Sequence, residues 1–181
     1  MDDISRELSI SKKTLYKEVK DKDEVVTLST RYHLDSEHKE FEEVTKASID
    51  AIDQLVKLSQ CMRKNLRDIN PSLLFDLKKY HRPAWEEWVE FKLEFIHNSI
   101  VENLRWGMRE GLFKDDLSVD ILAIMRLQQV EMSFNNDIYP TDRFDFREVQ
   151  MVLFDHFVCG ILTEKGRGLY DQYRKQEPIN A

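Results

Sequence analysis

The chain contains 181 residues, of which 27 are Lys or Arg and 34 are Asp or Glu, so its formal charge is −7. With 41% hydrophobic and 10% aromatic residues it can bury a sizeable core, which excludes an intrinsically disordered chain and predicts a globular protein of ordinary domain size. The longest strictly apolar run, Ile121–Met125, is too short to span a membrane, and no secretory signal is recognisable near Met1. We therefore expect a cytoplasmic protein without a membrane partner.

The chain carries no recognisable catalytic or metal-binding signature. Cys61 and Cys159 are isolated and match no zinc or redox spacing, so we expect two reduced thiols in the core. No histidine pairs with Cys, Asp or Glu at a recognised metal spacing, and no nucleophile motif such as G-x-S-x-G is present. The sequence favours a protein that is not an enzyme and that holds no metal or cofactor.

The positions of glycine and proline predict the fold class. None of the five glycines precedes Gly107, and none of the four prolines precedes Pro71. Seventy residues without either type argue against β-hairpins, and the glycine spacing excludes the phosphate-binding loops of nucleotide-binding folds. The sequence predicts an all-α protein.

Apolar residues at helical spacing predict a series of helices along the chain. They lie near residues 2–8, 12–19, 22–43, 49–62, 73–77, 83–111, 118–135 and 146–163. We expect Asn70-Pro71 to separate two of them and Gly111 to end the longest. The pair Gly166 and Gly168 should end the last helix.

The first two short helices carry the most specific signal. They are joined by Ser9-Ile10-Ser11, a turn of the length that a helix-turn-helix requires. The apolar residues that would lock the two helices together are Ile4, Leu8, Ile10 and Leu15. The polar, basic residues on the opposite face of the second helix are Lys12, Lys13, Tyr16 and Lys17. This pattern favours a second helix that enters a DNA major groove.

The charge distribution agrees with a small DNA-binding patch. Ser11–Lys22 holds five Lys against Glu18 and Asp21, a local charge of +3, which leaves −10 for the remaining residues. A protein this acidic can contact phosphates only through that patch. The alternative is an ordinary bundle in which these lysines lie on a solvated helix face.

The segment from Asp2 to Val25 resembles the DNA-binding segment of TetR-type bacterial transcriptional regulators. The resemblance rests on Ile4, Ser11, Thr14-Leu15-Tyr16 and Lys22-Asp23-Glu24. Two later segments resemble the family more loosely. Gly107–Phe113 with Asp115-Asp116-Leu117 is similar to the junction that follows the family's long seventh helix. Gly160–Gly166 is similar to the end of its ninth helix.

The resemblance implies residues 1–46 as a helix-turn-helix domain with a connecting helix, and 47–181 as an effector-binding and dimerisation bundle. It implies a homodimer that binds double-stranded DNA at a palindromic operator. It further implies that Thr14, Tyr16 and Lys22 contact phosphates, whereas Ser11, Lys12, Lys13 and Lys17 lie along the groove. Lys22 would also open a helix whose N-terminal amides can bind a phosphate.

The sequence departs from the family pattern in three places. Ser9 stands where the family usually has Gly, which would cost about 1 kcal/mol in a left-handed conformation. Glu18 and Val19 replace an aromatic-rich pair and put an acid near the DNA face. The family also has a helix before the one at Asp2, so we expect residues before Met1 to be absent from this chain; the alternative is an incomplete DNA-binding domain.

Two further predictions concern the second domain. Its large aromatic residues predict a cavity for a mostly apolar effector, lined by Phe75, Tyr80, Trp88, Phe91, Phe95, His97 and Gln128, although a solid core is the alternative. The apolar surface of the last two predicted helices predicts a four-helix dimer interface, unless these helices only cap the core. Its residues are Ile121, Val149, Val152, Leu153, His156, Phe157 and Gly160.

These features predict a transcriptional regulator, a repressor that a small molecule releases from DNA. The alternative is a helical ligand-binding or protein-interaction domain without DNA binding. The departures at Ser9 and Glu18 favour that alternative.

Overall fold

The computed structural model describes residues 1–65, 70 and 72–176, and over these residues the prediction of an all-α fold is confirmed. The elements are α1 (Asp2–Glu7), α2 (Lys12–Glu18), α3 (Lys22–Ala47), α4 (Ala51–Asn65), α5 (Leu73–Tyr80), α6 (Arg82–Glu90), the π-helical segment η2 (Phe91–Ile96), α7 (His97–Arg109), α8 (Val119–Ser133), α9 (Phe146–Ile161) and α10 (Glu164–Gln176). No described helix is both long enough and apolar enough to cross a membrane.

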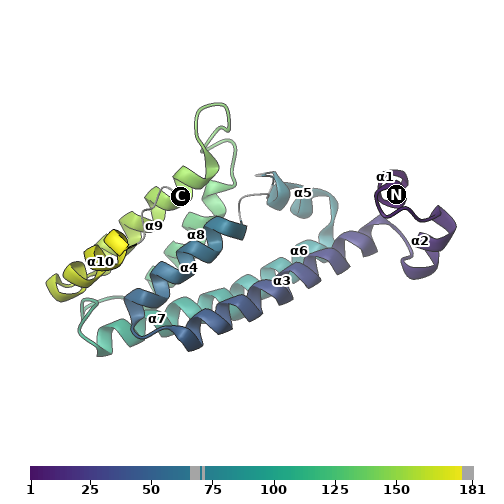
Figure 1. Ribbon diagram of the computed structural model, residues 1–181. Coiled ribbons are helices and arrows are strands. Elements are labelled where there is room, and N and C mark those ends of the chain that lie inside the picture. Colours follow the sequence, from purple (N-terminus) through teal and green to yellow (C-terminus); the bar gives the residue numbers. More distant parts are fainter. Residues whose placement is uncertain (66–69, 71, 177–181) are drawn as a thin grey trace.

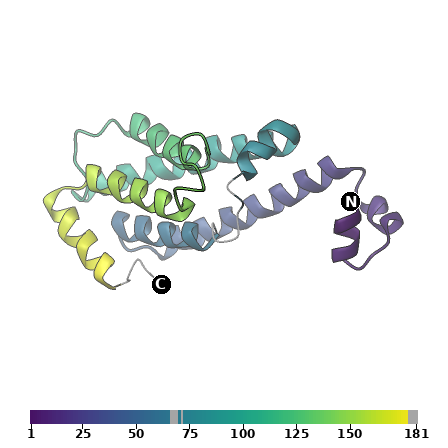
Figure 2. The same cartoon turned by 90° about the horizontal axis from the view of Figure 1, so that it is seen from above.

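The helices form an elongated molecule with two unequal parts. Helices α1 and α2 stand at one end, beyond the start of α3, and the larger bundle lies at the other end (Figure 1). Seen from above, α3 alone bridges the distance between the two parts (Figure 2). Any change in the position of α3 would therefore move α1 and α2 relative to the bundle.

The starts of α2 and α3 follow from local capping. The Ser11 side chain accepts a hydrogen bond from the Thr14 amide at 3.0 Å, and Asp21 accepts one from the Glu24 amide at 2.9 Å. Glu24 in turn accepts a hydrogen bond from the Lys20 amide. Reciprocal bonds of this kind stabilise a helix start and need only residues close in sequence.

The long helix expected from Pro83 to Gly111 is continuous but contains a π-helical stretch. It runs through α6, η2 and α7 from Arg82 to Arg109, and Gly111 follows with a φ of 68°. It lies parallel to α3 (Figure 1), as three contacts taken in chain order show. These contacts are Asp23 with His81, Arg31 with Glu87, and His38 with Phe95. Helix α3 therefore covers the first half of this helix along much of its length.

The core lies where α4, α7, α9 and α10 meet. Its largest fully buried side chains are Ile52, Leu104, Phe113, Val158 and Ile161. The loops after α7 and α9 meet beside this core in a short antiparallel contact between Phe113 and Leu162. The two glycine-containing segments that resemble TetR-type regulators thus lie against each other.

The prediction that Gly166 and Gly168 end the last helix was wrong. Helix α9 ends at Ile161, and both glycines lie inside α10. Gly166 is needed for packing, since a Cβ there would lie 2.1 Å from the Leu112 carbonyl oxygen, whereas a Cβ at Gly168 would meet open space. In the sequence, a glycine that allows close packing cannot be distinguished from a glycine that ends a helix.

The two cysteines and the expected helix break at Asn70-Pro71 were also predicted from the sequence. Cys61 and Cys159 are only half-buried, rather than core residues, and Arg167 donates a hydrogen bond to the Cys159 sulfur. The expected break at Asn70-Pro71 lies partly outside the described residues.

Candidate nucleic-acid interface and effector region

Helices α1 and α2 form a tight helix-turn-helix unit. The Ile10 amide donates to the Ser5 carbonyl at 3.0 Å, and Ser9 adopts a left-handed φ of 53°, the conformation for which glycine would be the ordinary residue. Ser5 and Leu15 are buried where the helices meet. Leu8 and Ile10, expected to lock the joint, are instead 58% and 37% exposed, because no described element covers that side.

The seven predicted DNA-contacting residues are exposed, but three of them already have local partners. Ser11 and Thr14 share a hydrogen bond at 2.8 Å at the start of α2. Lys12 forms an ion pair with Asp2, which lies outside the segment counted above and neutralises part of its positive charge. The remaining four are Lys13, Tyr16, Lys17 and Lys22. These three lysines and one tyrosine are exposed on α2 and at the start of α3.

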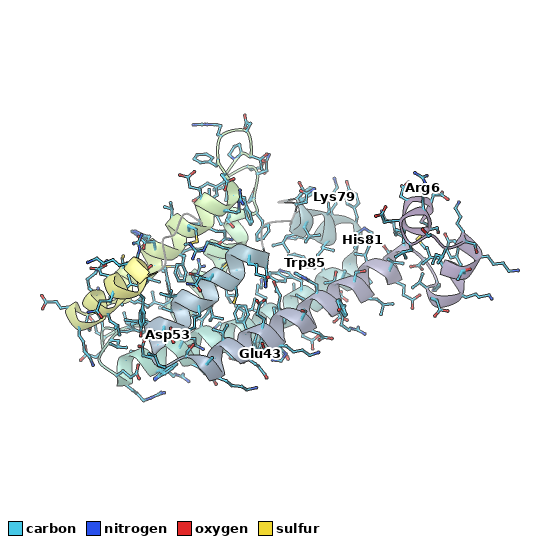
Figure 3. The ribbon with its side chains drawn as sticks, in the orientation of Figure 1. Arg6, Glu43, Asp53, Lys79, His81 and Trp85 are labelled. Carbon is cyan, nitrogen blue, oxygen red and sulfur yellow. The ribbon has the colours of Figure 1, made fainter. Side chains whose placement is uncertain are left out.

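The start of α3 is tied to the turn before α6. His81 lies at this turn, close to the beginning of α3 (Figure 3), with its Nδ1 2.6 Å from an Asp23 carboxylate oxygen. Two turns further along α3, Arg31 forms an ion pair with Glu87 of α6. These contacts join the helix that carries α1 and α2 to the helix that enters the bundle.

The predicted aromatic lining of an effector cavity does not form one surface. Phe95 contacts His38 and Phe41 of α3, with ring centroids 4.0 and 5.8 Å apart, and Trp88 and Phe91 belong to the same cluster. Phe75 and Tyr80 on α5 are each 59% exposed. The rings of the long helix pack instead against α3, and the predicted effector cavity stays a prediction.

The two polar residues expected to orient an effector, His97 and Gln128, differ in their exposure to solvent. His97 is half-buried, whereas Gln128 is exposed and donates a hydrogen bond to Glu131. Two small cavities, of about 10 and 20 Å³, lie elsewhere, where α4 and α9 meet and beside α10. None of the seven predicted effector-binding residues lines either cavity.

A layer of buried polar residues crosses the bundle beside the smaller cavity. Arg126 of α8 is 5% exposed, and its guanidinium lies 5.3 Å from the centroid of the Phe154 ring. Burial lowers its pKa to about 10, so it stays protonated at neutral pH. Gln150 donates to Ser133 and to the Val130 carbonyl. Arg126 was not predicted as a site residue, although its position on the apolar stripe of Ala123, Leu127 and Val130 was a usable signal.

The predicted dimer residues fall into two groups. Val149 and Phe157 are buried in the protomer core, so they cannot form an exposed interface, and Leu153 is half-buried. Ile121, Val152, His156 and Gly160 are exposed on α8 and α9, and a Cβ at Gly160 would meet open space. Ile124 and Met125 extend the same surface and are 54% and 40% exposed. The described part of the chain thus exposes three large apolar residues on α8 and one, Val152, on α9.

Comparisons with known proteins support the fold assignment. No family model matches this sequence, and no curated protein matches it. The structure is similar to that of the ketosteroid transcriptional regulator KstR2 of Mycobacterium tuberculosis, with a TM-score of 0.65 and 17% identity over 90% of this chain and 84% of that one. KstR2 is a TetR-family transcriptional regulator. The resemblance seen in the sequence is thereby confirmed at the level of structure, and the chain has the fold of a TetR-family regulator.

Proposed function

We propose that this protein is a DNA-binding transcriptional regulator that binds a palindromic operator as a homodimer and represses until a small molecule releases it. The observation that carries the proposal is a helix-turn-helix with an exposed basic face, held at the free end of a TetR-type fold. In this arrangement α2 is the recognition helix, and Lys13, Tyr16 and Lys17 face the major groove. Lys22 contacts a phosphate at the start of α3.

The proposed dimer uses the exposed apolar face of α8 and α9. Single apolar residues on a surface are ordinary, but a contiguous apolar face on two adjacent helices is typical of an interface. A second copy that covers Ile121 and Val152 would form an isologous four-helix contact with Gly160 at a point of close approach. Two recognition helices would then read half-sites about one helical turn, or a multiple of it, apart.

The proposed release works through α3. A molecule bound in the bundle that displaces α6 or α7 would displace α3 through Asp23–His81 and Arg31–Glu87. Because α1 and α2 follow the end of α3, the separation of the two recognition helices in the dimer would change. Such an effector acts only through its different affinity for the two arrangements.

A salt-dependent gel shift with the promoter of the protein's own gene tests DNA binding. The double variant Lys22→Ala, Tyr16→Ala should lose most of the affinity, while Lys22→Ala alone should weaken all sequences equally and flatten the salt slope by about one unit. Lys13→Ala should relax sequence preference if its side chain reaches base edges. Lys175→Ala, in α10 at the far end of the molecule, is the control for loss of one positive charge.

Unchanged affinity in the double variant would overturn the assignment of α2 as the recognition helix. The alternative function is a helical ligand-binding or protein-interaction domain that does not bind DNA. The Lys12–Asp2 ion pair and the exposed Glu18 favour it, since both reduce the positive charge of the α2 surface. Absence of any salt-dependent DNA binding by the wild-type chain would support this alternative.

A further inference from the structure

Arg126 is a buried cation for which the described residues provide no hydrogen-bond acceptor at either terminal nitrogen. Its Nη1 and Nη2 have no partner, although the residue is only 5% exposed. The guanidinium lies over the Phe154 ring, with its carbon 5.3 Å from the ring centroid. A guanidinium in this position has lost its hydration, and a ring face replaces only part of that stabilisation. The arrangement lacks a negatively charged partner.

Two acidic residues of α8 and α9 that are near Arg126 or Phe154 in the sequence are already paired. Glu131, five residues further along α8, forms an ion pair with Lys92 at 2.6 Å. Asp155, next to Phe154 on α9, accepts hydrogen bonds from Tyr170 at 3.0 Å and from Arg174 at 2.7 Å. Both carboxylates thus have cationic partners already, and neither is hydrogen-bonded to the terminal nitrogens of Arg126.

A second copy of the chain cannot supply the missing charge. Ile121, Ile124 and Met125 lie on the exposed side of α8, whereas Arg126 faces the interior of the same protomer. A carboxylate on a partner surface would therefore meet the apolar side of α8 and not the guanidinium. The partner of Arg126 must be small enough to enter the bundle.

The neighbouring interior suits the apolar part of such a molecule. The apolar residues that line the cavity of about 10 Å³ are Met62, Met151 and Phe154, whose ring also faces Arg126. The same cavity is also lined by Ser59, Gln150, Arg63 and Arg147. This volume holds no organic molecule, so entry requires side chains to move, and methionine side chains adapt readily to a new shape. The buried Oε1 atoms of Gln129 and Gln150 also lack a donor among the described residues, which leaves this layer polar and incompletely bonded.

We propose that Arg126 anchors the carboxylate of an organic acid with an apolar body, bound inside the bundle between α4, α8 and α9. A guanidinium matches a planar carboxylate through two parallel hydrogen bonds. The carboxylate site itself does not depend on the proposed function. Only the role of the acid as the effector rests on it. This assignment differs from the sequence-based expectation of a mostly apolar effector in a cavity lined by residues that include His97 and Gln128.

The test compares acids with their primary amides on the full chain, by thermal shift and by calorimetry. The probes are butanoate, hexanoate, decanoate, cinnamate and 4-phenylbutanoate, with inorganic phosphate as a plain anion. At least one acid should bind about tenfold to a hundredfold more tightly than its amide, the value of one or two hydrogen bonds to a charged group. The proposal is overturned if no acid binds better than its amide, or if phosphate alone stabilises the protein as well as the best acid.

Arg126→Met separates an anchoring role from a general structural one. Without ligand, this variant should melt at a higher temperature than wild type, because a buried cation without a partner is replaced by an apolar side chain of similar length. It should also lose the preference for acid over amide. Arg105→Met on the exposed face of α7 is the matched control and should change neither property. A retained acid preference in Arg126→Met would also overturn the proposal, and if that variant does not fold, the wild-type comparison decides.

A gel shift run in parallel keeps the two proposals distinguishable. A chain that binds an acid through Arg126 but never shifts DNA would remove the proposed regulator function and leave the carboxylate site in place. A chain that shifts DNA but shows no acid preference would remove the site alone.

Discussion

The Nδ1 atom of His81 lies 2.6 Å from the Oδ1 atom of Asp23, so the turn before α6 is joined to the first turn of α3. The His81 side chain is mostly buried, and that of Asp23 is more than half exposed. Asp23 follows Lys22, the predicted phosphate contact, by one residue. The contact thus joins the bundle to the start of α3, which directly follows the helix-turn-helix.

This contact should couple measurably to DNA binding. In a double-mutant cycle of Asp23→Asn and His81→Gln, we expect a coupling energy of about 0.5–1 kcal/mol for operator affinity, which decreases at high salt because the pair is partly exposed. The cycle of Arg82→Gln and Glu86→Gln is the control, since that ion pair lies within α6 alone. Equal coupling for both pairs would show that His81 transmits nothing to α3.

The two glycines of α10 should respond oppositely to alanine. Gly166→Ala places a Cβ 2.1 Å from the Leu112 carbonyl oxygen and should lower the free energy of unfolding by roughly 1–3 kcal/mol, because backbone must move. In Gly168→Ala the new Cβ meets open space within a helix, so this variant should raise the free energy of unfolding by about 0.5–1 kcal/mol. Urea unfolding measures both, and a destabilising Gly168→Ala would contradict the described course of α10.

Ser9→Gly should stabilise the helix-turn-helix. The left-handed φ of 53° at Ser9 costs an L-residue about 1 kcal/mol that glycine does not lose. Hydrogen exchange of the α1 and α2 amides should slow in this variant. Ser36→Gly, at an exposed position inside α3, is the control and should have the opposite effect on α3. Faster exchange in Ser9→Gly would exclude a left-handed turn.

The thiol of Cys61 should react slowly. Burial and the nearby Glu40 carboxylate raise its pKa to about 11, so near pH 8 its thiolate fraction is roughly a hundredfold below that of an ordinary cysteine. In a Cys159→Ser background, labelling by a disulfide reagent should be slow at pH 8 and should accelerate up to about pH 11. The urea-unfolded chain supplies the reference rate, and equal rates in the folded and unfolded chains would contradict this environment.

Val152→Glu should prevent dimerisation. Val152 is 60% exposed on the apolar face of α9, and two buried glutamates across a two-fold axis would repel each other. Light scattering should give twice the 21.6 kDa chain mass for wild type and the single mass for the variant. Ile49→Glu, at a site 76% exposed before α4, is the control. A monomeric wild type at micromolar concentration would count against the proposed interface.

Sequence alone determined the features that depend on residues close together in the chain. The all-α class follows from the absence of glycine before Gly107 and from apolar spacing. The short connection between α1 and α2 and the start of α3 agree with the capping residues Ser11 and Asp21. A cap joins atoms only three residues apart, so its chemistry is visible in the sequence. The left-handed conformation of Ser9 agrees with the resemblance to TetR-type regulators, which usually have glycine at this position.

The tertiary structure decided which side chains meet across helices. Periodicity placed Phe95 on an apolar stripe, but only the packing of α3 parallel to the long helix set His38 and Phe41 against it. Arg126 lies on the apolar stripe of α8 in the sequence, but only the packing of Phe154 of α9 against that face shows that the guanidinium is buried. A helical pattern identifies the face that needs a neighbour, whereas the choice of neighbour depends on how all the helices pack together.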